Sequence, residues 1–276
     1  MKKLFRFFEL VFFINCFIII LAAIVDIEVF RTYLRFNRYG YMGLYNSNNQ
    51  ASFYFIFMIS YYYYETFFRK TKPYKFVFVL LCSFLIGTKK LYFFFPLLLL
   101  FDLIFFKRYL KKWFWACVGI ASILGMVFYQ RISEFISDKF EILVDVYQRL
   151  GFMAGITSGR SIHLTNTIND IILPKWTWAN YIFGGSQFYI SRPEMEVFDI
   201  YIFFGVLGVL GYVWFFKKLL HFFNATVYLK SILLIFIVTG LFAAGFIVSA
   251  NQPIVFLLVF SCIAIMEKEK VSTNNS

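Results

Sequence analysis

Long apolar runs separated by short polar segments fill most of the chain. A helix needs about 20 mainly apolar residues to cross a bilayer, and most of these runs have roughly that length. The pattern therefore predicts an all-α, polytopic integral membrane protein with about eight transmembrane helices. The predicted helices lie in the segments 7–25, 51–68, 76–106 (as a pair), 113–129, 198–216, 227–247 and 254–266.

The run 76–106 contains one polar interruption, Thr88-Lys89-Lys90. If this run crossed the membrane as one helix, both lysines would lie near the bilayer centre, at a cost of about 2.5–3.5 kcal/mol each. A turn at 87–90 between two helices brings the lysines to the membrane edge and removes this cost. We therefore predict a helical hairpin.

Basic residues cluster in one set of the connections between the apolar runs. By the positive-inside rule these connections are cytoplasmic, so both termini are predicted to lie in the cytoplasm. The polar stretch 130–197 then becomes a large extracytoplasmic loop within a single membrane domain, 1–276. The basic clusters lie at 2–6, 69–75, 107–112, 217–218 and 268–270.

The composition agrees with this prediction and excludes other classes of protein. Hydrophobic residues make up 61% of the chain and aromatic residues 24%, whereas apolar residues form about half of a soluble domain. The net charge of +12 lies in short clusters between apolar runs, which favours contact with a lipid bilayer and its anionic headgroups over nucleic acid. The four cysteines lie inside apolar runs without a Cys-x-x-Cys motif, so neither a disulfide framework nor a zinc site is expected.

The segment 157–163 of the loop has the composition of a phosphate-binding turn. Its glycine lets a ligand approach the backbone closely, and Ser158, Arg160 and Ser161 supply hydrogen-bond donors. Arginine suits phosphate because its planar guanidinium binds two oxygens and keeps its charge. A capped helix start with a surface arginine explains the same residues equally well. The segment ends at His163, a further candidate, although an isolated histidine is more often structural.

The polar stretch ends at Arg192-Pro-Glu194-Met-Glu196-Val-Phe-Asp199, directly before a predicted helix. Glu196 and Asp199 are three residues apart, so they share a face if the helix starts here. Carboxylates at a helix N-terminus interact favourably with the helix dipole, which is the plain structural interpretation. A carboxylate at the mouth of a membrane helix can also act as a general base.

Two further groups of cations lie next to predicted helices. Lys89 and Lys90 are either anchors at the membrane edge or cations that bind a lipid diphosphate. Arg38 begins a segment with two glycines and an asparagine cluster that leads to Ala51. Asparagine caps helices well, so this segment alone predicts only the start of a helix. Glycines recur at every third position over 205–211, which predicts a close contact between helices.

The order of these features resembles the O-antigen polymerase and O-antigen ligase superfamily of bacterial membrane glycosyltransferases. The family has an arginine and glycine segment ending in Asn-x-x-Ala, a Gly-Ser/Thr-Arg/Lys turn, a Ser/Thr-Gly-Arg in a large outer loop, and an acidic or histidine signature before a Gly-x-x-Gly helix. The resemblance covers roughly residues 36–215. The matching segments, in chain order, are Arg38 to Ala51, Gly87-Thr-Lys89, Ser158-Gly-Arg160, Glu194 to Asp199, and Gly205 to Gly208.

The chain departs from the family in two ways. Ligase-type members carry a histidine near the last signature, where this chain has Glu196 and Asp199, and this difference favours a polymerase. Family members also commonly have more membrane segments before the first motif. The chain is therefore expected to be a short or N-terminally truncated member.

The resemblance implies a substrate, a polyprenyl-diphosphate-linked oligosaccharide at the outer face of a bacterial cytoplasmic (inner) membrane. The implied reaction joins such repeat units into capsular, exo- or O-antigen polysaccharide. A flippase and a chain-length regulator of the same pathway are the implied protein partners. No metal and no cofactor are expected, because the diphosphate bond already stores the energy and basic residues can offset the charge of the leaving group.

Under this interpretation Arg160 stabilises the leaving diphosphate. Glu196, ahead of Asp199 or Glu194, accepts the proton of the attacking hydroxyl. The remaining candidates bind substrate: Arg38, Lys89, Lys90, Ser158, Ser161, His163 and Arg192.

Two alternatives remain open. A ligase would transfer a finished glycan to another acceptor, and a non-enzymatic membrane protein would carry or assemble components of polysaccharide export. A transporter would place its polar residues at the membrane midplane within a doubled architecture, whereas here they concentrate in one loop.

Overall fold

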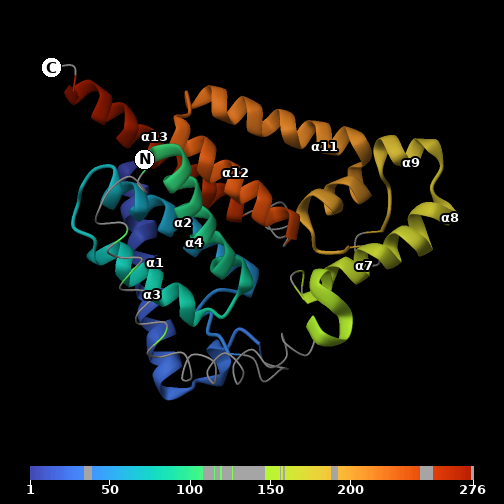
Figure 1. Cartoon of the computed structure of the whole chain (residues 1–276), viewed down its shortest axis with the longest axis horizontal. Helices are drawn as coiled ribbons and strands as arrows, with labels where there is room; N and C mark the ends of the chain where they lie inside the picture. The colour runs from blue at the N-terminus through green and yellow to red at the C-terminus, as the bar shows by residue number, and fades with distance from the viewer. Residues whose placement is uncertain are drawn as a thin grey trace.

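The fold is all-helical in a computed structural model of the chain (Figure 1). No strand occurs among the described residues, where an isolated bridge pairs Arg31 with Tyr41. The prediction of an all-α architecture is therefore confirmed for this part of the chain. The structure describes residues 1–33, 39–107, 115, 119, 126, 147–155, 157, 159–187, 192–242 and 251–274.

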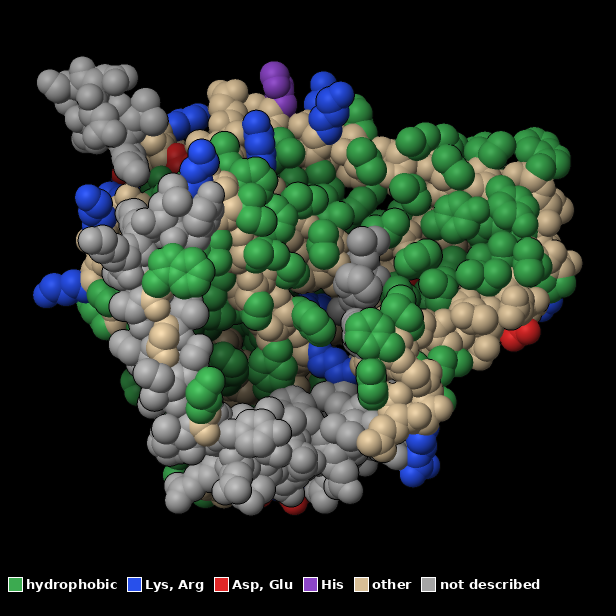
Figure 2. Space-filling view, viewed as in Figure 1, with side chains coloured by type: hydrophobic (Ala, Val, Ile, Leu, Met, Phe, Trp, Pro, Cys, Tyr) green, Lys and Arg blue, Asp and Glu red, His purple; other side chains and the backbone are tan. Residues whose placement is uncertain are grey.

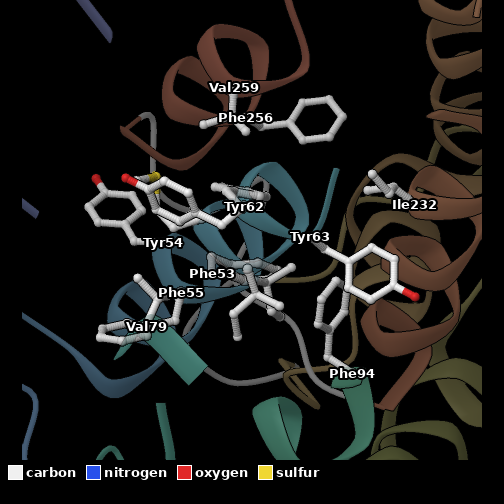
Figure 3. Packing of buried hydrophobic residues seen from close by; sticks show 14 of the residues in the cluster. Phe53, Tyr54, Phe55, Tyr62, Tyr63, Val79, Phe94, Ile232, Phe256 and Val259 are labelled. Carbon is white, nitrogen blue, oxygen red and sulfur yellow. The ribbon is translucent and has the colours of Figure 1, made fainter. Parts of the chain in front are cut away.

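Helix α2 (Asn48–Phe67) is the centre of a helical bundle. Residues 51–60 are all buried, because aromatic and aliphatic side chains cover every face of this helix rather than one stripe. Figure 3 shows side chains of α2 pointing outward in several directions toward the surrounding helices. Those helices are α1 (Lys2–Val25), α3 (Tyr74–Leu85), α4 (Lys89–Phe106), α12 (Val227–Phe242) and α13 (Asn251–Asn274).

Ring contacts join α2 to its neighbours. Phe55 lies 4.7 Å from Phe12 of α1, measured between ring centroids. Phe53 lies 5.3 Å from Phe236 of α12, and Phe57 lies 5.6 Å from Phe256 of α13. Such aromatic pairs add about 0.5–1.5 kcal/mol each beyond the burial of their area, so they contribute to holding the bundle together.

The predicted hairpin at 76–106 is present as α3 and α4, joined by a turn at 86–88. Gly87 has φ +70°, and a Cβ atom at this position would lie 2.0 Å from the carbonyl oxygen of Tyr39. The turn is therefore packed against the backbone of residues 39–41, where Tyr41 N donates to Leu85 O at 2.8 Å. This contact brings the segment before α2 beside the start of α4.

The two chain termini lie at the same end of the bundle (Figure 1). Lys2 of α1 forms a 2.6 Å ion pair with Glu269 of α13, and Lys75 of α3 forms a 2.8 Å ion pair with Glu9 of α1. The opposite end carries the start of α2, the turn before α4 and the start of α13. We call it the distal end, defined by residues 48, 88 and 251.

Three helices in the described part of the chain are long and apolar enough to cross a membrane. They are Lys2–Val25, Glu196–Phe222 and Asn251–Glu269, and shorter apolar helices occur at Tyr74–Leu85 and Val227–Gly240. These apolar helices agree with the prediction from the sequence that the chain is a membrane protein. Most of the segment 113–129 lies outside the described residues, so the count of eight helices stays a prediction.

A second group of elements extends sideways from the distal end (Figure 1). Much of the stretch 130–197, predicted as a loop, is helical where it is described. Its elements are α7 (Arg160–Thr167), η3 (Ile168–Ile172), α8 (Leu173–Lys175) and α9 (Trp178–Phe183), followed by α11 (Glu196–Phe222).

Helix α11 is broken at Gly205, whose φ of +62° and ψ of −160° are not helical. A Cβ atom at Gly205 would lie 2.3 Å from the carbonyl oxygen of Ile182, and one at Gly184 would lie 2.3 Å from the backbone of Phe203. The end of α9 therefore packs backbone to backbone against the break. The predicted stripe of glycines between two helices is wrong, because a Cβ atom at Gly211 would meet nothing within 4 Å.

Candidate functional site

Lys89 and Lys90 open α4 at the distal end and reach toward different partners. Lys89 Nζ donates to the carbonyl oxygen of Gly155, which ends the described helical run 147–155. A cation is favourable there because the carbonyl end of a helix carries partial negative charge. The hairpin is thus fastened to the segment that precedes α7.

Lys90 is buried, with 7% of its surface exposed. Its ammonium lies 3.9 Å from the centroid of the Phe53 ring and donates to Asn49 Oδ1 at 3.4 Å. A lysine so far removed from water needs such partners, because an isolated buried charge is costly. Lys90 is thus enclosed by protein side chains, whereas a simple anchor would expose its ammonium at the surface.

Arg160 is the first residue of α7, which begins after Gly159 in the left-handed conformation. Its guanidinium binds Glu194 Oε2 through Nη2 at 3.1 Å and through Nε at 3.4 Å. Glu194 itself has φ +57°, an uncommon conformation for a residue with a side chain. The pair joins two segments 34 residues apart, and both side chains are only partly buried.

Glu196 and Asp199 lie in the first turn of α11 and are both buried, as the shared face predicted. Asp199 Oδ2 accepts from Arg192 Nε at 3.4 Å. Glu196 lies beside α12, since a Cβ atom at Gly240 would be 3.5 Å from its Cβ. Favourable interaction with the helix dipole explains part of this placement, but burial of two carboxylates goes beyond plain capping.

Electrostatic interactions join these residues into one group. The Lys90 ammonium interacts with Arg160, Glu194 and Glu196, and Asp199 interacts with Arg192 and Glu196. We call the six residues the polar cluster: Lys90, Arg160, Arg192, Glu194, Glu196 and Asp199. Figure 2 shows Lys and Arg side chains recessed near the centre of one face, between the bundle and α7.

The structure separates the remaining candidates from the polar cluster or leaves them undescribed. Ser161 accepts from Thr157 Oγ1 at 3.1 Å and so helps to form the start of α7. His163 is exposed on α7 and joins none of the hydrogen bonds described here. Arg38 and Ser158 lie outside the described residues, so their places in the site stay predictions.

Sequence reasoning missed two polar residues at the distal end. Asn49 was interpreted only as a helix cap, yet it is the hydrogen-bond partner of Lys90. Gln252, the second residue of α13, is 1% exposed, and a polar residue at the start of an apolar helix was the available signal. Within the described part of the chain, Gln252 Oε1 and Asp199 Oδ1 are buried acceptors without a hydrogen-bond partner. Buried acceptors are nearly always satisfied, so both can accept from a bound hydroxyl group.

A metal centre is not indicated by the side chains that the structure describes, since no group of three or more His, Cys, Asp or Glu residues is placed to hold an ion. The three carboxylates of the polar cluster instead lie among three cations. Such an arrangement suits an anionic ligand that can replace a carboxylate as the hydrogen-bond partner of a cation, because arginine binds phosphate and carboxylate through the same donors.

The polar cluster therefore draws on α4, the start of α7 and the start of α11, with Asn49 of α2 beneath it. Comparison of the chain with models of known protein families, with curated proteins and with solved structures found no match in any of the three.

Proposed function

We propose that the protein is a membrane glycosyltransferase that polymerises polyprenyl-diphosphate-linked oligosaccharide repeat units at the outer face of a bacterial cytoplasmic membrane. One observation carries the proposal: the motifs that resemble the O-antigen polymerase superfamily, although far apart in the sequence, converge at the distal end. Lys90 follows the Gly87-Thr-Lys89 turn directly, and it interacts with Arg160, Glu194 and Glu196. The backbone just after Arg38 packs on the same turn.

The proposed reaction is a direct displacement at the anomeric carbon of the donor. A hydroxyl oxygen of the acceptor sugar bonds to this carbon, and the bond from the carbon to the diphosphate oxygen breaks. The electron pair of that bond leaves with the polyprenyl diphosphate. Because negative charge grows on the leaving group, nearby fixed cations stabilise the transition state more than the ground state.

Arg160 and Lys90 are the proposed cations for the diphosphate. Without substrate, Glu194 occupies the donors of Arg160. Glu194 is 47% exposed at its side chain, so a diphosphate from the membrane surface can replace it as the partner of Arg160. Arginine binds either anion in the same planar geometry.

Glu196 is the proposed base that accepts the proton of the attacking hydroxyl. It is preferred to Asp199, because Arg192 already binds Asp199 at 3.4 Å. Arg192 then positions Asp199 rather than binding the substrate. Asp199 Oδ1 and Gln252 Oε1, two of the buried acceptors without a hydrogen-bond partner in the described part of the chain, are available to sugar hydroxyl groups.

The test uses the full-length chain in a strain that lacks the native gene, with surface glycan analysed on a gel. Arg160→Ala and Glu196→Gln are each expected to abolish the ladder of long chains while single repeats persist, since loss of one charge-stabilising group lowers such rates by about 10²–10³-fold. Asn166→Ala, at an exposed polar residue of the same helix α7, is the matched control and should keep the ladder. Membrane levels of all variants are compared by immunoblot.

Other outcomes would contradict the site assignment or favour another function. Unchanged ladders from both variants would contradict the assignment of the site. Long lipid-linked chains that stay unattached indicate a ligase, and the absence of even single delivered repeats indicates a carrier.

A further inference from the structure

The segment around α9 exposes large apolar side chains at the edge of the molecule. Leu173 is 67% exposed, Trp178 75% and Phe183 62%. Leu173 belongs to the short helix α8, and Trp178 and Phe183 belong to the short helix α9. Together they make the exposed surface of this segment apolar. Exposed contiguous apolar surface of this kind marks contact with a membrane or another protein.

The apolar surface of α9 continues onto α11. The part of α11 after Gly205 belongs to a helix that is long and apolar enough to cross a membrane. Its outward side chains include Leu207, 49% exposed, and Leu210, 58% exposed. Figure 2 shows apolar side chains covering α11 and α9 together on the same face. Because the lipid-facing side of α11 runs into α9 without interruption, the bilayer is the occupant that fits this surface.

Several contacts hold α9 against α11. Gly184 and Gly205 let the two backbones touch, as described above, and Ser186 N donates to Ile202 O at 3.4 Å. Trp176 Nε1 donates to Ser186 Oγ at 3.0 Å, and the Trp176 ring lies 5.6 Å from the ring of Tyr201. These contacts fix α9 against the first half of α11, before the break.

The polar groups at both ends of α9 are satisfied internally. Thr177 and Asn180 form a reciprocal capping box at the start of the helix. At its end, Gly184 N donates to Asn180 O at 2.7 Å, and Asn180 Nδ2 donates to Gly184 O at 3.0 Å. In lipid, where no water replaces a missing partner, backbone groups must be satisfied in this way.

We propose that residues 173–187 and 192–205 form a re-entrant unit that enters the leaflet at the distal end and leaves on the same side, with Trp178 and Phe183 against the acyl chains. A six-residue helix spans about 9 Å, far short of the roughly 30 Å hydrocarbon core, so α9 is too short to cross the membrane. Lys175, exposed one turn before α9, lies where an anionic headgroup is favourable.

The unit holds the first half of α11, so it places Glu196 and Asp199 at the level of the lipid headgroups. A lipid-linked ligand would then meet the polar cluster without leaving the bilayer. The inference itself rests on the apolar surface, the glycine contact and the satisfied backbone, and it holds whatever reaction the polar cluster performs.

The test measures membrane depth by spin labels on the full-length chain. The four native cysteines are replaced by alanine, and single cysteines are introduced by Trp178→Cys, Phe183→Cys and, as control, Asn166→Cys. All three positions are exposed, so the labels need no rearrangement of the fold. Each labelled protein is reconstituted into vesicles of phosphatidylethanolamine and phosphatidylglycerol, and collision rates with oxygen and with a water-soluble nickel chelate are recorded.

Labels at 178 and 183 are expected to collide readily with oxygen and several-fold less with the nickel chelate than the label at 166. Equal collision with the nickel chelate at all three positions would place α9 in water and overturn the proposal. Exclusion of both reagents together with dipolar broadening between labels would show a second copy of the chain on this surface, and would also overturn it.

Discussion

Lys90 shows how one residue links the bundle to the polar cluster. It is buried, and the charges that offset its own come from Glu194 and Glu196, on a segment more than 100 residues away in the sequence. The Phe53 ring and Asn49 solvate the ammonium from the side of the bundle. Opposite charges that are shielded from water stabilise each other, and removal of one leaves the other uncompensated. The two sides of the site are therefore energetically coupled.

A double-mutant cycle measures this coupling. Lys90→Met is expected to lower the free energy of unfolding by about 2–3 kcal/mol, because it removes one of the cations that offset the buried carboxylate of Glu196. Adding Glu196→Gln removes that charge, so the double variant should be more stable than the sum of the single effects by about 1–2 kcal/mol. Thermal unfolding in detergent provides the measurement.

Lys89 supplies the matched control for this cycle. Its ammonium donates to the backbone carbonyl oxygen of Gly155. The effects of Lys89→Met and Glu196→Gln should therefore add within about 0.5 kcal/mol, as for independent sites. Equal coupling in both cycles would mean that Lys90 has no special relation to Glu196.

At the scale of elements, the break in α11 determines where the acidic residues lie. An unbroken helix would carry Glu196 and Asp199 along the axis of Val206 to Phe222, away from α4. The left-handed backbone of Gly205 instead turns the first half of α11 toward the bundle (Figure 1). Glycine adopts this conformation readily, whereas a residue with a Cβ atom is strained there.

Gly205→Ala is therefore expected to destabilise the protein by more than about 2 kcal/mol, from the strained φ and from the clash with Ile182 O at 2.3 Å. Gly211→Ala is the control on the same helix. A Cβ atom there meets nothing within 4 Å, and alanine favours a helix by up to about 1 kcal/mol over glycine. Thermal unfolding of the two variants should therefore shift in opposite directions, and equal shifts would argue against the break.

At the scale of the whole molecule, the sequence predicts those features that follow from a large local energetic cost or from the spacing of nearby residues. The hairpin at 86–88 follows from the cost of placing Lys89 and Lys90 in lipid, and the shared face of Glu196 and Asp199 follows from their spacing. The gathering of the polar cluster could be expected only through the order of the family-like motifs, because spacing says nothing of contacts between distant segments.

What could not be predicted depends on contacts between segments distant in the sequence. Gly205 was interpreted as part of a helix-packing stripe, because the backbone of Gly184 that it meets is not visible from periodicity. The pairing of Arg160 with Glu194 likewise depends on how α7 and the start of α11 meet. The burial of Lys90 against Asn49 depends on where α2 lies, and no local sequence pattern predicts that position.

The arrangement of the bundle makes a prediction about membrane sidedness. The ion pair between Lys2 and Glu269 holds the first and last helices together at one end, and the polar cluster lies at the other. If the basic clusters lie inside, as the positive-inside rule predicts, the polar cluster is predicted to face the outside. A cysteine introduced by Asn166→Cys in the cysteine-free chain should therefore react with a membrane-impermeant maleimide in intact spheroplasts. Cysteines introduced at the exposed Lys3 and Lys268 should react only after permeabilisation, whereas labelling of either in intact spheroplasts would reverse the orientation and remove the site from the outer leaflet.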